Sequence, residues 1–246
     1  MQFKIWQKIF IGISIPALIT LAGGLLTYQY IKDVKIRHGF VEIADDLRER
    51  VLEVRRNEKN FLLHKNDEYY KYCEHTLVLF NNSSNSISSE IINQVGVEDF
   101  SLLRNSVQTY SSLIYALLLS YHHEEQIVEN VRERGRQLES YAAAGIHAKE
   151  LSTNFILNLR RYEKNYMLFR DNKSFDQLND ALTQFGNITP FCAECSRYAE
   201  GIRELFSIYN KNSTMVGDLQ VIGDKLEDIT NRIAKGERQK VRAFFT

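Results

Sequence analysis

The chain has 246 residues, with 31 lysines and arginines balanced by 31 aspartates and glutamates. This balance argues against a nucleic-acid-binding protein, because affinity for phosphate depends on clustered basic side chains. The three cysteines are too few for a disulfide framework, and the two prolines leave room for long uninterrupted helices.

A long apolar stretch lies near the N-terminus. Residues 9–27 read IFIGISIPALITLAGGLLT and contain no charged side chain. A helix of this length nearly matches the hydrocarbon core of a bilayer, which is roughly 30 Å thick. We therefore expect a transmembrane helix over residues 9–31, preceded by a cytoplasmic N-terminus over residues 1–8. The alternative is a cleaved secretory signal, but the stretch is longer than usual and offers only a poor cleavage site near Ala22.

Beyond this segment, apolar residues recur at alternating steps of four and three positions. One such series starts at Phe40 and ends at Phe61, and comparable series fill residues 100–142 and 191–233. This spacing is typical of long helices that pack at shallow angles, and no stretch shows the period of two that a strand needs. We expect six helices, near residues 5–64, 67–80, 97–143, 146–169, 173–188 and 190–240.

The third of these helices would be about 70 Å long, which exceeds the length of one small bundle. Two bundles must therefore share it. The sequence predicts an all-α fold, in which an N-terminal transmembrane helix is followed by two stacked four-helix bundles. About six helices build this fold, and two of them are long.

Residues 55–63 (RRNEKNFLL) recur as residues 160–168 (RRYEKNYML), with six of the nine residues unchanged. The repeat extends over about residues 40–80 and 145–185 and indicates two related helical modules. Each copy ends at polar turn residues that are suited to cap the next helix. These turns are Lys65-Asn66-Asp67 and Arg170-Asp171-Asn172.

In each copy the glutamate, Glu58 or Glu163, falls on the apolar seam of its helix. A carboxylate at such a position loses hydration and needs a cation or several hydrogen-bond donors. Arg55 and Arg160 lie one turn earlier on the same helix face and can supply that cation.

A neighbouring face of each copy carries two further cations three residues apart. Two cations this close repel each other unless an anion or a carboxylate lies between them. One interpretation is a pocket for a small carboxylate-bearing ligand, and the other is a structural clamp between helices. The candidate ligand-binding residues are Arg55, Arg56, Lys59, Arg160, Arg161 and Lys164. The candidate clamp residues are Glu58, Asn60, Glu163 and Asn165.

The duplicated segment resembles the helical bimodular sensor domain of bacterial transmembrane sensor histidine kinases and chemoreceptors. The resemblance covers about residues 38–240 and is carried by Arg55–Leu63 and its copy Arg160–Leu168. It implies six helices in two stacked four-helix bundles on the periplasmic side, each able to hold a small ligand, typically an organic acid. The wording of the N-terminal segment and of the first motif is closer to the kinases than to the chemoreceptors.

Three other local patterns have simpler explanations. Cys192 and Cys195 have redox spacing, but no βαβ pattern surrounds them, so a buried structural thiol or a local disulfide is favoured. Residues 122–125 (HHEE) could ligate a metal, yet consecutive helical residues point in different directions, which favours a solvated helix face. Glycine and leucine pairs on the long helices allow close backbone approach and sliding, or tight packing alone. These pairs are Gly135 with Leu138 and Gly223 with Leu226.

These features predict the signal-input region of a bacterial transmembrane receptor, most consistent with a two-component sensor histidine kinase. It would sense a small carboxylate ligand in the periplasm and pass a helix shift across the inner (cytoplasmic) membrane. The alternatives are the sensor region of a chemoreceptor (methyl-accepting chemotaxis protein) and a membrane-tethered scaffold for a partner protein. Residues 241–246, which follow a basic run, read as the start of a second transmembrane helix.

The partners that we expect are the membrane, the small ligand, a second copy in a homodimer and a periplasmic binding protein. The balanced charge excludes nucleic acid from this set. Because the sequence contains no catalytic, phosphate-loop or metal-ligand motif, we expect no cofactor, no metal and no enzymatic activity in this stretch.

Overall fold

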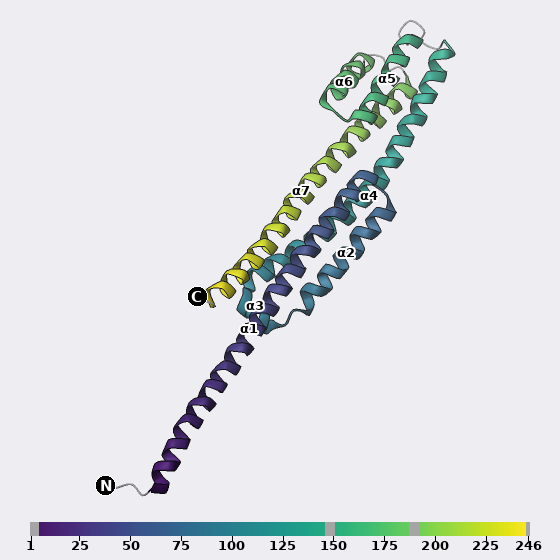
Figure 1. The fold of residues 1–246 in the computed structure, drawn as a ribbon. Coiled ribbons are helices and arrows are strands. Elements are labelled where there is room, and N and C mark those ends of the chain that lie inside the picture. The colour runs from purple at the N-terminus through teal and green to yellow at the C-terminus, as the bar shows by residue number, and fades with distance from the viewer. Residues whose placement is uncertain (1–4, 146–150, 187–191, 245–246) are drawn as a thin grey trace. The chain divides into compact units, whose positions relative to one another are not determined.

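The computed structural model describes residues 5–145, 151–186 and 192–244. These residues form seven helices and no strand, which confirms the all-α prediction for the described part of the chain (Figure 1). The helices are α1 (Ile5–His64), α2 (Asp67–Ser86), α3 (Ser89–Val95), α4 (Val97–Ala143), α5 (Thr153–Phe169), α6 (Asn172–Gly186) and α7 (Ala193–Phe244).

The observed helices agree best with the predicted ones where the apolar series are longest. The predicted bounds 5–64 and 97–143 are those of α1 and α4. By contrast, α2 runs past residue 80 to Ser86, and α3 has no counterpart among the predicted helices. Ser88 begins α3 because its side chain accepts a hydrogen bond from the Ile91 N–H, the usual role of serine at a helix start. The starting positions expected at residues 146 and 190 lie outside the described residues, but α5 and α7 begin later than predicted, since the described residues 151, 152 and 192 are not helical.

The predicted membrane segments correspond to the N-terminal part of α1 and the C-terminal end of α7. In the part of the chain that the structure describes, no helix combines the length and apolar character needed to cross a membrane. Within the predicted span, the side chains of residues 9–11, 13 and 15 lie outside that description. Residues 245–246, in the expected second span, also lie outside it.

The chain forms two compact units. Unit 1 comprises residues 1–57, 73–108 and 223–246, and unit 2 comprises residues 58–72 and 109–222. Helices α1, α2, α4 and α7 therefore contribute residues to both units, whereas α3 belongs to unit 1 and α5 and α6 belong to unit 2. Residues 58–72 of the first repeat, which include the turn between α1 and α2, are consequently part of unit 2.

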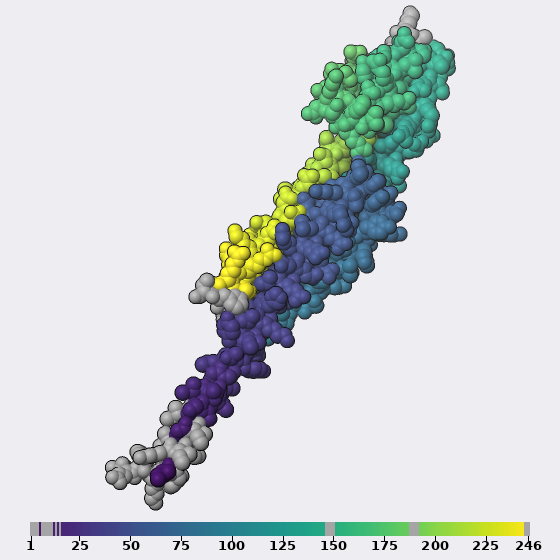
Figure 2. Space-filling view, in the orientation of Figure 1, coloured from purple at the N-terminus to yellow at the C-terminus, as the bar shows by residue number. Residues whose placement is uncertain are grey.

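The core of unit 1 is built from the predicted apolar series. On α1, the side chains of Ala44, Leu47, Val51 and Val54 are almost fully buried. Figure 2 shows α1 and α2 side by side in this unit, where the Asn57 side chain donates a 2.8 Å hydrogen bond to Thr76 Oγ1. Helices α2, α4 and α7 complete the core with Leu77, Phe80, Phe100, Leu103, Val107, Leu226, Ile229 and Ile233.

The core of unit 2 is continuous across α4, α5, α6 and α7. Helix α6 supplies an apolar face through Leu178, Ala181 and Phe185, all of them buried. Beside them, the ring centroids of Tyr166 and Phe206 are 5.0 Å apart in an edge-to-face arrangement. Burial of such apolar surface is the main favourable contribution to folding, and here it fixes the α5–α6 hairpin on the long helices.

Candidate functional site

In unit 2, the guanidinium of Arg160 lies across Gly135 of α4. A Cβ atom added to Gly135 would lie only 2.1 Å from Arg160 Nη1, so no other residue leaves room for this side chain. Arg160 Nη1 donates to Glu163 Oε2, and Arg160 Nε donates a 2.8 Å bond to Glu139 Oε1. We call this arrangement of Arg160, Gly135 and Glu139 the unit 2 arginine clamp.

Glu163, which accepts a hydrogen bond from Arg160 of the clamp, has no solvent exposure. Burial raises the pKa of its carboxyl, while the hydrogen bond from Tyr198 and the nearby Arg160 charge oppose that shift. Tyr198 Oη donates this bond at 2.6 Å. The sequence correctly places Glu163 on a buried seam with Arg160 as its cation.

Unit 1 contains an equivalent clamp on Arg55. A Cβ atom added to Gly223 of α7 would lie 2.1 Å from Arg55 Nη1. Arg55 Nε donates to Glu227 Oε1 at 3.1 Å, and Nη2 donates to Asp224 Oδ1 at 2.8 Å. The receiving helices therefore share a motif, GRQLE at residues 135–139 and GDKLE at residues 223–227, in which glycine and glutamate lie on one face.

Glu58, the other seam glutamate, belongs to unit 2 and is also buried. It accepts a hydrogen bond from Tyr110 Oη of α4, as Glu163 does from Tyr198 of α7. Both glutamates therefore pair with a tyrosine on a long helix. The sequence series include both tyrosines as apolar positions but do not reveal their role as donors.

The remaining predicted site residues lie nearer to solvent. Arg56, Lys59, Arg161, Lys164 and Asn60 are exposed, and Asn165 is half-buried. Arg56 forms a 3.5 Å ion pair with Glu53, and the Arg161 guanidinium lies 5.2 Å from the Tyr162 ring centroid. The outer cations thus occupy a solvent face, whereas Arg55 and Arg160 are held in the clamps.

A second pair of repeat-equivalent cations lies in unit 2, directly after the ends of α1 and α5. Lys65 and Arg170 have φ angles of 53° and 52°, the left-handed conformation that only glycine adopts easily. Their N–H groups bind the carbonyls of Phe61 and Tyr166 at 2.7 and 3.0 Å and close the two helices. Residues other than glycine are uncommon in this conformation, so the two repeats share an unusual backbone feature at equivalent positions.

Both cations approach the same carboxylate, that of Glu124 on α4. Arg170 Nη2 lies 2.6 Å from Glu124 Oε1, and Lys65 Nζ lies 3.7 Å from that oxygen. The side-chain amide of Asn212 donates a 2.6 Å bond to the other carboxylate oxygen, Oε2. Glu124 is only 6% exposed, so the predicted solvated face at residues 122–125 is wrong for this residue, because its neighbours supply the cations that burial requires.

Among the described residues, no group of histidine, cysteine, aspartate and glutamate side chains could hold a metal ion. The adjacent His122 instead lies 2.9 Å from Asp67 Oδ1 through its Nε2. We call Lys65, Arg170, Glu124 and Asn212 the carboxylate centre.

Two tyrosines flank the carboxylate centre. Lys65 Nζ lies 4.6 Å from the Tyr121 ring centroid, and the Arg170 guanidinium lies 4.1 Å from that of Tyr209. Burial raises the pKa of each phenol to about 12, so both rings stay neutral at physiological pH. Each cation is therefore held over the face of a neutral ring.

The carboxylate centre borders a cavity of about 510 Å³ in unit 2. This volume lies within the range of small-molecule sites, roughly 300–1,000 Å³. The lining carries three cations and three carboxylates, so its formal charge is balanced, but two of the cations, Lys65 and Arg170, share the single carboxylate of Glu124. An anionic ligand could pair with the cation that Glu124 does not neutralise. The lining residues are His64, Lys65, Asn66, Asp67, Tyr121, His122, Glu124, Glu125, Val128, Arg132, Met167, Arg170 and Tyr209.

A larger cavity of about 840 Å³ in unit 1 has an acidic lining. Its wall includes four carboxylates from α1, of which Asp45 and Asp46 pair with Arg238 and Arg50 at 2.5 and 3.0 Å. The other two are Glu42 and Glu49.

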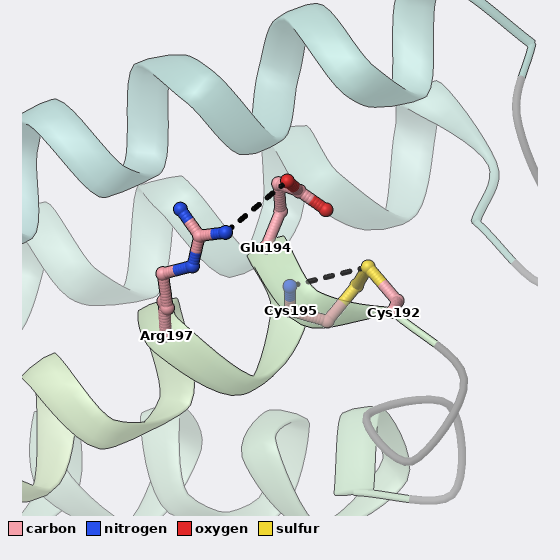
Figure 3. Close-up of a disulfide and its surroundings, with 4 residues drawn as sticks. All are labelled: Cys192, Glu194, Cys195 and Arg197. Atoms are coloured by element: carbon pink, nitrogen blue, oxygen red, sulfur yellow. Dashed lines mark hydrogen bonds and ion pairs between the residues drawn. A yellow bond between two sulfur atoms is a disulfide. The ribbon is translucent and has the colours of Figure 1, made fainter.

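Cys192 and Cys195 form a disulfide at the start of α7 (Figure 3). Both residues are buried, and Cys192 Sγ accepts a 3.1 Å hydrogen bond from the Cys195 N–H. The nearby Glu194 and Arg197 form a 3.7 Å ion pair. Because attack on a disulfide requires access to its sulfur atoms, this burial favours a structural role over a redox centre.

No protein-family model matches this chain, and no curated protein matches it either.

Proposed function

We propose that the chain is the extracytoplasmic signal-input region of a bacterial transmembrane receptor, and that the unit 2 cavity binds a small organic acid. One observation carries the proposal. The residues that end the two repeated helices, Lys65 and Arg170, converge in strained conformations on one carboxylate beside an open cavity. Strain of this kind is concentrated at ligand sites, because only the surrounding structure can maintain it.

Two of the cations that line the cavity support a carboxylate-bearing ligand. An entering carboxylate would meet the cations at Lys65 and Arg170, of which Glu124 neutralises one unit of charge. The ring faces of Tyr121 and Tyr209 and the thioether of Met167 offer apolar contact to the rest of a small molecule.

The sequence supports membrane attachment through the N-terminal part of α1. Its apolar side chains Leu18, Ile19, Leu21, Leu25 and Leu26 are exposed, and a bilayer would remove them from water. We propose the inner membrane as the location, with the sensor region in the periplasm and two copies in a homodimer. The resemblance to helical bimodular sensor domains favours a histidine-kinase output, with a chemoreceptor as the alternative.

The clamps offer a route by which ligand binding could move the long helices. Arg55 ties α1 to α7 within unit 1, and Arg160 ties α5 to α4 within unit 2. Because each arginine occupies the space above a glycine, a small displacement of the helix that carries the arginine shifts its contact with the helix that carries the glycine.

Titration calorimetry on the full 246-residue chain in detergent tests the ligand half of this proposal. We expect heat with at least one of acetate, succinate and benzoate, and no heat with matched amines such as ethylamine, because Lys65 and Arg170 would attract the acids and repel the amines. The double variant Arg56→Met with Arg161→Met should bind the same acid equally well, since these cations lie on the exposed face. Binding that disappears in this control would move the site to the outer cations.

A second candidate function is a scaffold for a partner protein. The observation that favours it is the exposure of Leu63 and Leu168, equivalent residues one position before the ends of α1 and α5, together with Phe169. If none of the acids gives heat or raises the melting temperature, the scaffold becomes the better account.

A further inference from the structure

We propose, building on the carboxylate-sensing function above, that Lys65 is the residue that reads the ligand. The ligand's carboxylate takes the Lys65 ammonium from Glu124, while Arg170 and Asn212 keep Glu124 in place. Occupancy of the cavity is thereby converted into release of the α1–α2 turn from α4.

The contacts of Glu124 are unequal. Arg170 and Asn212 each contact the carboxylate at 2.6 Å, which is typical of strong charge-assisted hydrogen bonds. Lys65 Nζ stands 3.7 Å from Oε1, too far for a hydrogen bond. Asn212 is itself fixed by a 2.5 Å bond from Ser120 Oγ. Glu124 therefore keeps its strong partners when Lys65 leaves.

Lys65 would also gain from a new anion. Its side chain is 33% exposed and lines the cavity, so an entering molecule can reach it. Burial and repulsion from Arg170 lower its pKa, a cost that Glu124 offsets only in part. A second carboxylate beside the ammonium would favour its charged form.

The difference between the two repeats fits a division of roles. Arginine has a rigid planar fork that holds a carboxylate in fixed geometry, whereas lysine is a point charge on a flexible stem. Arg170 thus suits the fixed contact, and Lys65 at the equivalent position suits the exchangeable one.

When Lys65 leaves Glu124, the α1–α2 turn is held less firmly on α4. Lys65 and Asp67 both reach from the α1–α2 turn to α4, the first to Glu124 and the second to His122 at 2.9 Å. The His122–Asp67 pair is exposed and is an ion pair only when the histidine is protonated, so it holds the turn weakly. The ligand would therefore loosen residues 58–72 and leave the α5–α6 turn attached through Arg170.

Affinity for succinate measures the first half of the proposal. Lys65→Met should weaken succinate binding about 10- to 100-fold, the usual effect of losing a charged hydrogen bond, with little change in melting temperature. Glu124→Gln should strengthen succinate binding, because it removes the competitor for Lys65. Lys71→Met, which neutralises an exposed lysine of α2 in the same unit, is the matched control and should leave affinity unchanged. Equal affinity in Lys65→Met and wild type overturns the inference while leaving the proposed function intact.

Hydrogen exchange measures the second half of the proposal, the release of the α1–α2 turn from α4. The comparison of variants needs no ligand. Glu124→Gln and Lys65→Met should each raise exchange in residues 58–72, and the double variant should add little more. Succinate should raise exchange in the same residues of the wild-type chain. If no acid binds the wild type, the proposed function fails, and unchanged exchange in Glu124→Gln then overturns the Lys65 contact as well.

Discussion

Replacing Arg160 with methionine is expected to lower the free energy of unfolding of unit 2 by about 3–5 kcal/mol. Arg160 is the cation beside the fully buried Glu163, and Glu163 Oε1 already has no hydrogen-bond partner among the described residues. Without the guanidinium, the hydrogen bond from Tyr198 alone cannot offset the lost hydration of a carboxylate. Urea denaturation followed by circular dichroism measures the change.

Two companion variants show whether the buried charge is the cause. Arg161→Met removes the neighbouring exposed arginine and should change stability by less than about 0.5 kcal/mol. Arg160→Met combined with Glu163→Gln should recover most of the loss, since a neutral amide needs no cation. A double variant as unstable as Arg160→Met alone would show that packing of the arginine stem, rather than its charge, is what unit 2 requires.

The stability that Arg160→Met loses should depend on pH, because the pKa of Glu163 is raised. A carboxyl whose folded-state pKa exceeds its ordinary 4.5 contributes stability that is complete below pH 4.5 and is lost as pH rises through the folded value. Removing Arg160 takes away an interaction that opposes this shift, so the pKa should rise further. The deficit of Arg160→Met should therefore shrink in acid, where Glu163 is protonated.

Replacing Gly135 with alanine should destabilise unit 2 by about 2–3 kcal/mol, although alanine is the better helix former by about 1 kcal/mol. The new Cβ would lie 2.1 Å from Arg160 Nη1 and 2.3 Å from Cζ, so the guanidinium must move. The guanidinium cannot move freely, because it is bound to both Glu139 and Glu163. Displacing it partly reproduces the loss expected for Arg160→Met.

Gly217→Ala is the matched control for this second prediction, because no heavy atom lies within 4 Å of the position where its Cβ would stand. This change in the interior of α7 should stabilise the chain slightly. Gly223→Ala should cost less than Gly135→Ala, since Asp224 and Glu227, which Arg55 contacts, are more exposed than Glu163. Thermal unfolding of the three variants in parallel ranks them, and a stabilising Gly135→Ala would contradict the clamp.

The helical fold could be predicted because the apolar series is a local property of the sequence. The seven positions of the series from Phe40 to Phe61 (40, 44, 47, 51, 54, 58 and 61) are all buried, as their spacing predicts. Helix α3 was beyond this approach, because its seven residues are too few to show a period and its start depends on the cap at Ser88. The predicted pairing of Arg160 with Glu163 is confirmed, since both residues lie on one helix face.

The carboxylate centre could not be predicted in the same way. Glu124 lies on α4, far in sequence from Lys65 and Arg170, and only the packed chain brings these three residues together. The sequence did contain one usable signal, a basic residue at the same place after each repeat. Its left-handed backbone and its convergence on Glu124 depend on tertiary contacts that no periodicity encodes.

A crystal structure of the full chain grown with the tightest-binding small carboxylate tests the central claim most directly. The account predicts that the bound acid lies in the unit 2 cavity, with a carboxylate oxygen within about 3 Å of Lys65 Nζ and Glu124 still on Arg170. An acid bound instead at the exposed face of Arg56 or Arg161, or Lys65 still facing Glu124 with the acid in the cavity, would contradict it.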